Sequence, residues 1–106
     1  MIKLFVYGIL KDTAPGKKAW VIAKCYDLGA YPAITELGEG WLVEGKIIEV
    51  DQDTLNYFDQ IEGYPDLYHR QLVEINGEHC QVYVFTHPED IKDRVPCINF
   101  KRKGIV

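Results

Sequence analysis

A predicted β-hairpin in the second half of the chain is the feature that most constrains its fold. Residues 68–75 and 78–85 alternate between apolar and polar side chains, which is typical of strands that bury one face. Asn76 and Gly77 lie between these segments, and this dipeptide favours a two-residue type I′ turn because both residues tolerate positive φ angles. The sequence therefore predicts two antiparallel strands joined by a tight turn.

Three further segments have the composition of strands: residues 2–7, 19–29 and 41–50. Gly45, inside the last of them, indicates a bulge or a place where another backbone approaches closely. Residues 12–18 have the composition of a loop, and residues 86–106 have weak periodicity that allows one helical turn before an irregular tail. The pattern is rich in strands and contains neither a repeat nor a domain linker.

A short helix is predicted between the third of these strands and the hairpin. Asp51 or Asp53 can cap its start, because a carboxylate there accepts from the first unpaired backbone N–H groups. The helix should run to about Ile61, because Gly63 stands where a helix commonly ends in the left-handed conformation. We therefore expect roughly two turns of helix.

Two carboxylates of this helix fall on its apolar face. At about 100° per residue, Asp59 and Glu62 lie within about 40° of Leu55 around the helix axis, so they are expected to point toward the strands. Burial, the negative end of the helix and the neighbouring Asp59 should all raise the pKa of Glu62, which suits a general acid/base. A structural alternative stays open: Glu62 pairs with Arg70, or it accepts from backbone amides after Gly63.

Composition excludes several classes of function. A chain of 106 residues is long enough for one domain with one core. Its net charge of −4 provides no general attraction for nucleic acid or anionic lipid, so neither partner is expected. No stretch approaches the ~18 apolar residues of a membrane span, and the sequence starts in a strand pattern without a signal peptide. We therefore expect a cytoplasmic protein.

The thiol and imidazole side chains show no metal-binding pattern. The cysteines are Cys25, Cys80 and Cys97, and the histidines are His69, His79 and His87. The cysteines are odd in number and lack CxxC spacing, which predicts reduced, buried thiols. The histidines are not spaced as a helical pair of ligands, and exposed imidazoles are expected instead. The sequence therefore predicts neither a metal site nor a catalytic cysteine.

Three ordered motifs lie between residues 2 and 85. They are Tyr7-Gly8-Ile9-Leu10, Gly29-Ala30-Tyr31-Pro32, and Phe58-Asp59-Gln60-Ile61-Glu62-Gly63 followed by Tyr68-His69-Arg70. In these motifs the chain resembles the γ-glutamylcyclotransferase-like superfamily, especially its small γ-glutamylamine cyclotransferase branch, whose patterns are YG(S/T)L, GxYP and LDxxEG…YxR. The resemblance implies an α+β fold, a small, mostly antiparallel β-barrel with flanking short helices. It covers residues 2 to about 85, and we expect a single domain of residues 1–106, with 86–106 as a less regular tail.

The resemblance also implies an activity that needs no cofactor. In such enzymes the free α-amine of a γ-glutamyl compound attacks its own γ-carbonyl, which forms 5-oxoproline and releases an amine or amino acid. Glu62 falls on the position of the family's general acid/base. The implied substrate-binding residues are Tyr7, Gly8, Ile9, Leu10, Tyr31 and Tyr68, and Tyr83 is a further candidate for the pocket wall. The implied partner is a small γ-glutamyl molecule, and no oligomeric state is indicated.

One departure from the family pattern matters within these motifs. Ile9 stands where the family usually has serine or threonine, so a side-chain hydroxyl is missing although the backbone amides remain. The tail also lacks the family's usual Gly-Asp-Trp-like ending. Two functions are therefore considered: a cyclotransferase for a γ-glutamyl amine or related compound, and a catalytically silent protein that binds a small molecule in the same pocket.

Overall fold

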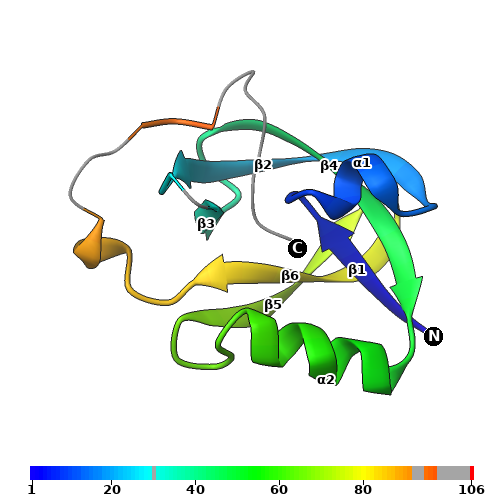
Figure 1. The fold of residues 1–106 in the computed structure, drawn as a ribbon. Coiled ribbons are helices and arrows are strands. Elements are labelled where there is room, and N and C mark those ends of the chain that lie inside the picture. Colours follow the sequence, from blue (N-terminus) through cyan, green and yellow to red (C-terminus); the bar gives the residue numbers. More distant parts are fainter. Residues whose placement is uncertain (30, 92–94, 98–105) are drawn as a thin grey trace.

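The computed structural model of the protein describes residues 1–29, 31–91, 95–97 and 106 (Figure 1). Its strands are β1 (Ile2–Val6), β2 (Lys17–Asp27), β3 (Pro32–Leu37), β4 (Trp41–Val50), β5 (Tyr68–Ile75) and β6 (Glu78–Phe85). Its helices are α1 (Leu10–Thr13), α2 (Gln52–Ile61) and the short 3₁₀ helix η1 (Pro88–Asp90). Within these ranges, no helix combines the length and apolar character needed to cross a membrane.

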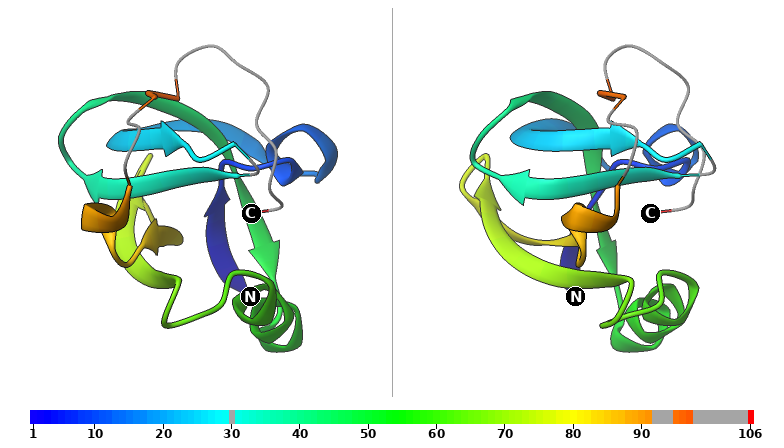
Figure 2. Two further views of the ribbon diagram at one scale, coloured as in Figure 1. Left: turned by 60° about the vertical axis from the view of Figure 1, so that its left-hand side comes forward. Right: turned by 90° about the vertical axis from the view of Figure 1, so that its left-hand side faces the viewer.

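The strands form one sheet in the order β3-β2-β4-β1-β6-β5. Neighbouring strands are antiparallel except for β1 and β6, which run parallel. The sheet curls strongly, so that β3 at one edge packs near β6 on the other side (Figure 2). The result is an open, mostly antiparallel barrel with α2 at one end, which confirms the predicted α+β fold class.

The hairpin has the predicted turn and register. β5 and β6 pair from Tyr68 opposite Phe85 to Ile75 opposite Glu78. The two turn residues both have positive φ angles, +53° at Asn76 and +79° at Gly77. These angles are those that a type I′ turn requires, and they match the right-handed twist of the flanking strands.

Helix α2 begins and ends where the sequence predicts. The side chain of Asp51 accepts a 2.7 Å hydrogen bond from the N–H of Thr54, so Asp51 is the N-cap and Asp53 lies in the first turn. Gly63 has a φ of +64°, the left-handed conformation that follows a helix end. Leu55 and Phe58 are buried and fix the helix against the sheet.

Gly45 lies on β4 close to the end of the neighbouring strand β1. A Cβ atom at this position would overlap the ring of Phe5 and the carbonyl oxygen of Val6. The pairing of β2 with β4 continues without interruption through Ala19 opposite Gly45. Of the two predicted explanations for this glycine, the close approach is therefore correct and the bulge is not.

Two elements were not expected from the sequence. Strand β3 lies between the predicted strands of residues 19–29 and 41–50, where no further strand was predicted. It escapes detection because it is a short edge strand that begins with proline, a residue without a backbone N–H. Helix α1 is a single turn that overlaps only the start of the predicted loop of residues 12–18, and it has no side-chain cap. η1 agrees with the single helical turn expected in the tail, whose remaining residues lie mostly outside the described ranges.

The core divides into two clusters on opposite faces of β1. Phe5 and Tyr7 belong to one cluster, whereas Leu4 and Val6 belong to the other, because successive side chains of a strand alternate between its faces. We call the second one the helix-side cluster; its buried members are Leu4, Val6, Tyr26, Ala33, Ile48, Val50, Leu55, Phe58, Tyr68, Tyr83, Phe85, Ile91 and Val106. The three cysteines are buried free thiols, as predicted.

Candidate active site

The segment after β1 presents two adjacent backbone donors. The N–H groups of Tyr7 and Gly8 donate to the carbonyl oxygen of Val106 at 2.8 and 2.9 Å. Two successive amides that converge on one oxygen can also bind a carboxylate or an oxyanion. The backbone donors expected from the first motif are therefore present, and in this structure Val106 accepts from both.

The side chain of Tyr7 holds neighbouring strands together. Its buried hydroxyl donates to the carbonyl oxygen of Tyr83 at 2.7 Å and accepts from the N–H of Ile34 at 3.2 Å. These bonds join the end of β1 to β6 and β3, where the two sides of the curled sheet meet. Burial holds the pKa of the phenol well above its ordinary range, so the group stays a neutral donor. We therefore assign the backbone of Tyr7, and not its hydroxyl, to the candidate site.

Glu62 lies immediately after α2, with its carboxyl group partly buried. It is the C-cap residue, and its N–H donates to the carbonyl oxygen of Phe58 at 2.9 Å. Burial raises the pKa of the Glu62 carboxyl, and a backbone hydrogen bond with Val106 opposes that rise. Val106 thus contacts both Glu62 and the Tyr7–Gly8 amide pair. Two motifs that are distant in the sequence meet around this one residue.

Glu62 is also electrostatically close to three phenols. Burial is the main reason for the raised pKa of Tyr68, and the negative charge of Glu62 adds to it. The same charge contributes more weakly to the raised pKa values of Tyr83 and Tyr7, again after burial. The carboxyl group of Glu62 therefore lies in a partly dry region bordered by neutral tyrosine hydroxyls.

Tyr68 and Tyr31 form a ring pair beside this region. Tyr68 is buried, and its hydroxyl donates to the carbonyl oxygen of Pro32 at 2.8 Å. The half-buried ring of Tyr31 packs edge-on against it, with centroids 6.1 Å apart. Tyr31 and Pro32 come from the second motif and Tyr68 from the third, so the predicted wall residues do lie together.

The carboxylate of Asp59, in α2, forms hydrogen bonds with a different group of side chains. Nε and an Nη of Arg70 donate to its two oxygens at 3.1 and 3.2 Å, and the phenol of Tyr83 donates to Oδ1 at 2.6 Å. Arg70 and Tyr83 are directly opposite each other on β5 and β6, so both side chains leave the same face of the hairpin. The guanidinium of Arg70 also lies over the ring of Tyr64, 4.6 Å from its centroid.

This arrangement corrects the structural alternative considered for Glu62. Arg70 pairs with Asp59 instead of Glu62. The backbone hydrogen bond to Glu62 involves Val106, and not the loop after Gly63. Burial is the main cause of the raised pKa of Glu62, and the charge of Asp59, which is paired with Arg70, does not contribute to it.

The last two residues of the first motif lie at the start of α1. Ile9 is the N-cap residue of this turn, and its side chain is 47% exposed and outside both core clusters. Leu10 is half-buried and packs against the helix-side cluster. The departure from the family pattern thus falls on a surface side chain next to the Gly8 amide.

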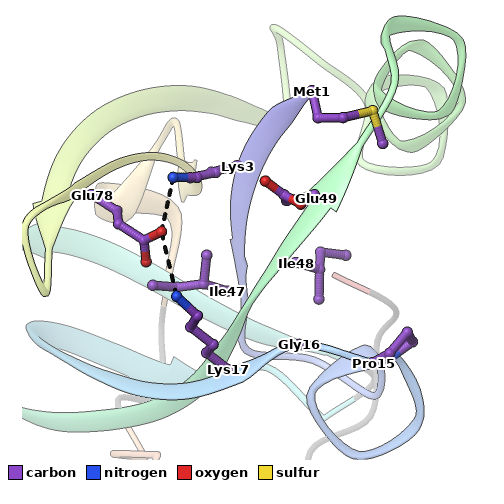
Figure 3. Close-up of a pocket in the computed structure, with 9 residues that line it drawn as sticks. All are labelled: Met1, Lys3, Pro15, Gly16, Lys17, Ile47, Ile48, Glu49 and Glu78. Atoms are coloured by element: carbon purple, nitrogen blue, oxygen red, sulfur yellow. Dashed lines mark ion pairs between the residues drawn. The ribbon is translucent and has the colours of Figure 1, made fainter.

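A cavity of about 480 Å³ lies elsewhere, at the opposite end of β1 (Figure 3). Its lining residues are Met1, Lys3, Pro15, Gly16, Lys17, Ile47, Ile48, Glu49 and Glu78. Lys3 and Lys17 both point at Glu78, at 2.8 and 3.8 Å, and the bond from Lys3 lowers the pKa of that carboxyl. These charges compensate one another, and the cavity contains none of the predicted site residues. We therefore place the candidate site around Glu62.

Sequence reasoning missed the part that Val106 takes in this site. The signal that could have indicated it is the apolar pair Ile105-Val106, which Gly104 separates from the basic run of residues 101–103. It also missed the hydrogen bond between Tyr83 and Asp59. Among the residues that the structure describes, no group of three or more histidine, cysteine or carboxylate side chains is arranged to hold a metal ion.

Comparison with known proteins agrees with the motifs. The family model described as gamma-glutamyl cyclotransferase, AIG2-like, matches residues 4–102. A putative gamma-glutamylcyclotransferase of Halalkalibacterium halodurans is 35% identical over 77 residues, which are 66% of this chain and 69% of that protein. The gamma-glutamylaminecyclotransferase of Rattus norvegicus is 28% identical over 117 residues and covers 81% of this chain and 78% of its own.

The fold has a similar match among solved structures. The crystal structure of an AIG2-like protein from Mus musculus superposes with a TM-score of 0.59 at 27% identity, over 84% of this chain and 81% of that one. The matches in sequence and in structure both extend over most of the chain, and the residues matched by the family model include all three motifs. The chain therefore belongs to the AIG2-like family of gamma-glutamyl cyclotransferases.

Proposed function

We propose that the protein converts a γ-glutamyl amine, or a related γ-glutamyl compound, into 5-oxoproline and releases the amine. Family membership supports the reaction class, and the name of the rat relative supports the substrate class. The observation that carries the proposal is that the carboxyl of Glu62, with its raised pKa, and the amide donors of Tyr7 and Gly8 converge on one residue of the chain. A proton-transfer group and an anion-binding pair are thus available at one place.

The substrate supplies its own nucleophile, so the protein's task is to fold it. Holding the α-amine against the γ-carbonyl turns the reaction into a favourable intramolecular step. The new C–N bond closes the five-membered ring, and the C–N bond to the released amine breaks. Glu62 takes a proton from the attacking nitrogen and returns it to the leaving nitrogen, which is why a carboxyl pKa raised toward neutrality is useful.

The remaining groups of the site position the substrate. The Tyr7 and Gly8 amides would receive the substrate's carboxylate or the oxyanion that develops at the γ-carbonyl, because both are acceptors for convergent N–H donors. Tyr31 and Tyr68 would form an aromatic wall beside the glutamyl chain. Ile9 would lie at the edge of the site, where it can change which compounds fit without removing the backbone donors.

The test of this proposal is a direct assay. The full chain is incubated with a panel of γ-glutamyl amines and γ-glutamyl amino acids, and 5-oxoproline is followed by mass spectrometry. Product from any member above the rate without protein supports the proposal. The Glu62→Gln variant should lose turnover while it stays folded, because the amide preserves the shape and removes the proton relay.

A matched control separates this effect from a general change of charge. Glu74 is an exposed glutamate on β5, so Glu74→Gln removes the same charge without changing the site. We expect this variant to retain full turnover. Equal activity of folded Glu62→Gln and Glu74→Gln would exclude Glu62 as the acid/base.

Binding without catalysis is the second candidate function, and Ile9 is the observation that favours it. If the panel yields no product, a metabolite screen by thermal unfolding distinguishes this case. A ligand at ~100 times its dissociation constant adds about 2.7 kcal/mol to the free energy of unfolding, which is easily detected. Stabilisation by a small amino-acid-like molecule without any product would replace the cyclotransferase proposal.

A further inference from the structure

The main chain of Val106 fills the two polar positions of the candidate site. Its carbonyl oxygen accepts from the N–H groups of Tyr7 and Gly8 at 2.8 and 2.9 Å. Its backbone also forms the hydrogen bond with the carboxyl group of Glu62. Figure 2 marks this end of the chain close to the end of β1, in agreement with these contacts.

The side chain of Val106 fixes this position. It is only 4% exposed and belongs to the helix-side cluster, together with Tyr68 and Tyr83. Burial of this apolar side chain among the residues that border Glu62 stabilises the position of the Val106 main chain. Val106 is therefore held in the site by contacts of both its main chain and its side chain.

The two hydrogen-bonding groups of Val106 resemble those of an amino acid. Its N–H and its carbonyl flank one Cα atom, as the α-ammonium and α-carboxylate of a glutamyl group do. A donor placed at Glu62 and an acceptor placed at an amide pair are the contacts that a free α-amino acid group needs. Val106 thus forms hydrogen bonds with the same protein groups that would bind the substrate.

We propose that Val106 is an intramolecular competitor of the substrate, whose main chain must leave the Tyr7–Gly8 amides before a γ-glutamyl compound can bind. This inference rests on the proposed function for the identity of the competing ligand. The contact is autoinhibitory because it withholds the amides and the carboxyl from solution. The apparent dissociation constant of the ligand then rises in inverse proportion to the fraction of molecules whose site is open.

The experiment weakens the contacts that hold Val106 in the site and measures the amides of Tyr7 and Gly8 directly. Val106→Asp places a charge where the valine side chain is buried and should expel the residue. Val106→Ala removes part of the apolar contact without adding charge, and it keeps the test available if the first variant unfolds. Val95→Asp is the matched control, because Val95 belongs to the same part of the chain but its side chain is 55% exposed.

Hydrogen exchange of the Tyr7 and Gly8 amide protons, measured by NMR, is the primary readout. We expect exchange to be at least about tenfold faster in Val106→Asp, intermediate in Val106→Ala and unchanged in Val95→Asp. Added 5-oxoproline should slow exchange again in Val106→Asp. If the site of the unaltered protein is open one tenth of the time, KM should fall about tenfold in Val106→Asp with kcat retained.

The two readouts separate this inference from the proposed function. Unchanged exchange of both amides in folded Val106→Asp and Val106→Ala overturns the competitor role, whatever the turnover. A raised KM in both variants also overturns it, because that result indicates a purely structural valine. Faster exchange that 5-oxoproline reverses, with no product from any substrate in any variant, supports the competition and overturns the proposed catalysis instead.

Discussion

The phenol of Tyr83 donates a 2.6 Å hydrogen bond to Oδ1 of Asp59, the same oxygen that accepts from Nε of Arg70 at 3.1 Å. The two donors come from facing positions of the hairpin, and the acceptor comes from α2. Because of this contact, the carboxylates of Asp59 and Glu62 have different partners. Asp59 connects the helix to the sheet, and Glu62 is left to contact the main chain of Val106.

Loss of the arginine should therefore destabilise the fold more than loss of the candidate catalytic charge. Arg70→Met leaves Asp59 without its cation, at side-chain exposures of 20% for Arg70 and 14% for Asp59. We expect the free energy of unfolding to fall by about 2–3 kcal/mol, measured by urea denaturation. Glu62→Gln should change it much less. Equal losses in the two variants would contradict the separation of roles.

The free energy of unfolding should depend on pH in a way that reflects the ionisation of Glu62. Its folded-state pKa lies above the ordinary 4.5, so between the two values the folded state binds more protons than the unfolded state. The contribution of the Glu62 carboxyl to the free energy of unfolding is fully present below pH 4.5. It is lost as pH rises through the folded-state pKa. Unfolding free energies of the unaltered protein and of Glu62→Gln should diverge over that window, with the unaltered protein losing more. Parallel curves would mean that the carboxyl is not perturbed.

Turnover should depend on pH in the opposite direction. Glu62 must be ionised to accept the first proton, so kcat/KM should fall as pH decreases through its raised pKa. The acid limb of the profile should therefore lie above pH 4.5. A profile that is flat down to that pH would indicate a different base. The measurement uses whichever substrate of the panel gives the highest rate.

Replacement of Ile9 should alter preference and leave the fold intact. Its side chain is half exposed and outside both core clusters, so Ile9→Ser should leave the free energy of unfolding within about 0.5 kcal/mol. If the residue borders the substrate, KM values across the panel should change more than kcat. Ile22→Ser, at a similarly exposed isoleucine of β2, is the control and should change neither. A silent binding protein would instead show weaker ligand binding without new activity.

The close approach at Gly45 should tolerate no side chain. Gly45→Ala forces a methyl group into the Phe5 ring and the Val6 carbonyl, and we expect a loss of about 2–3 kcal/mol in chemical denaturation. Gly38→Ala is the comparison, since its space is open and its φ of +92° imposes only a strain of about 1–2 kcal/mol. A smaller cost at Gly45 than at Gly38 would show that β1 can shift.

Local patterns predicted those elements whose stability depends on their own residues. The Asn76-Gly77 turn and the Asp51 cap are examples, because turn geometry and capping depend on a few adjacent positions. Strand β3 was missed because its formation depends on pairing with β2 and on burial of Ala33 and Ile34, and its own composition gives little signal.

The sequence motifs predicted candidate site residues, but they could not predict every contact between those residues. Helix geometry placed Asp59 and Glu62 inward, but it could not decide which of them meets Arg70. That choice depends on the register of β5 against β6, which brings Arg70 opposite Tyr83. The contacts of Val106 with Tyr7 and Gly8 join residues far apart in the sequence, and local patterns do not specify such pairings.

The parallel pairing of β1 with β6 affects how the protein can form during synthesis. β1 leaves the ribosome first and can pair with β4 once residue 50 is available, but its other edge needs Gln81 and Val82 of β6. Until then the nascent chain carries a central strand with an unpaired edge, which favours association between chains. A ribosome stalled inside the β5–β6 hairpin should thus hold an aggregation-prone intermediate that becomes protease-resistant only after residue 85 emerges.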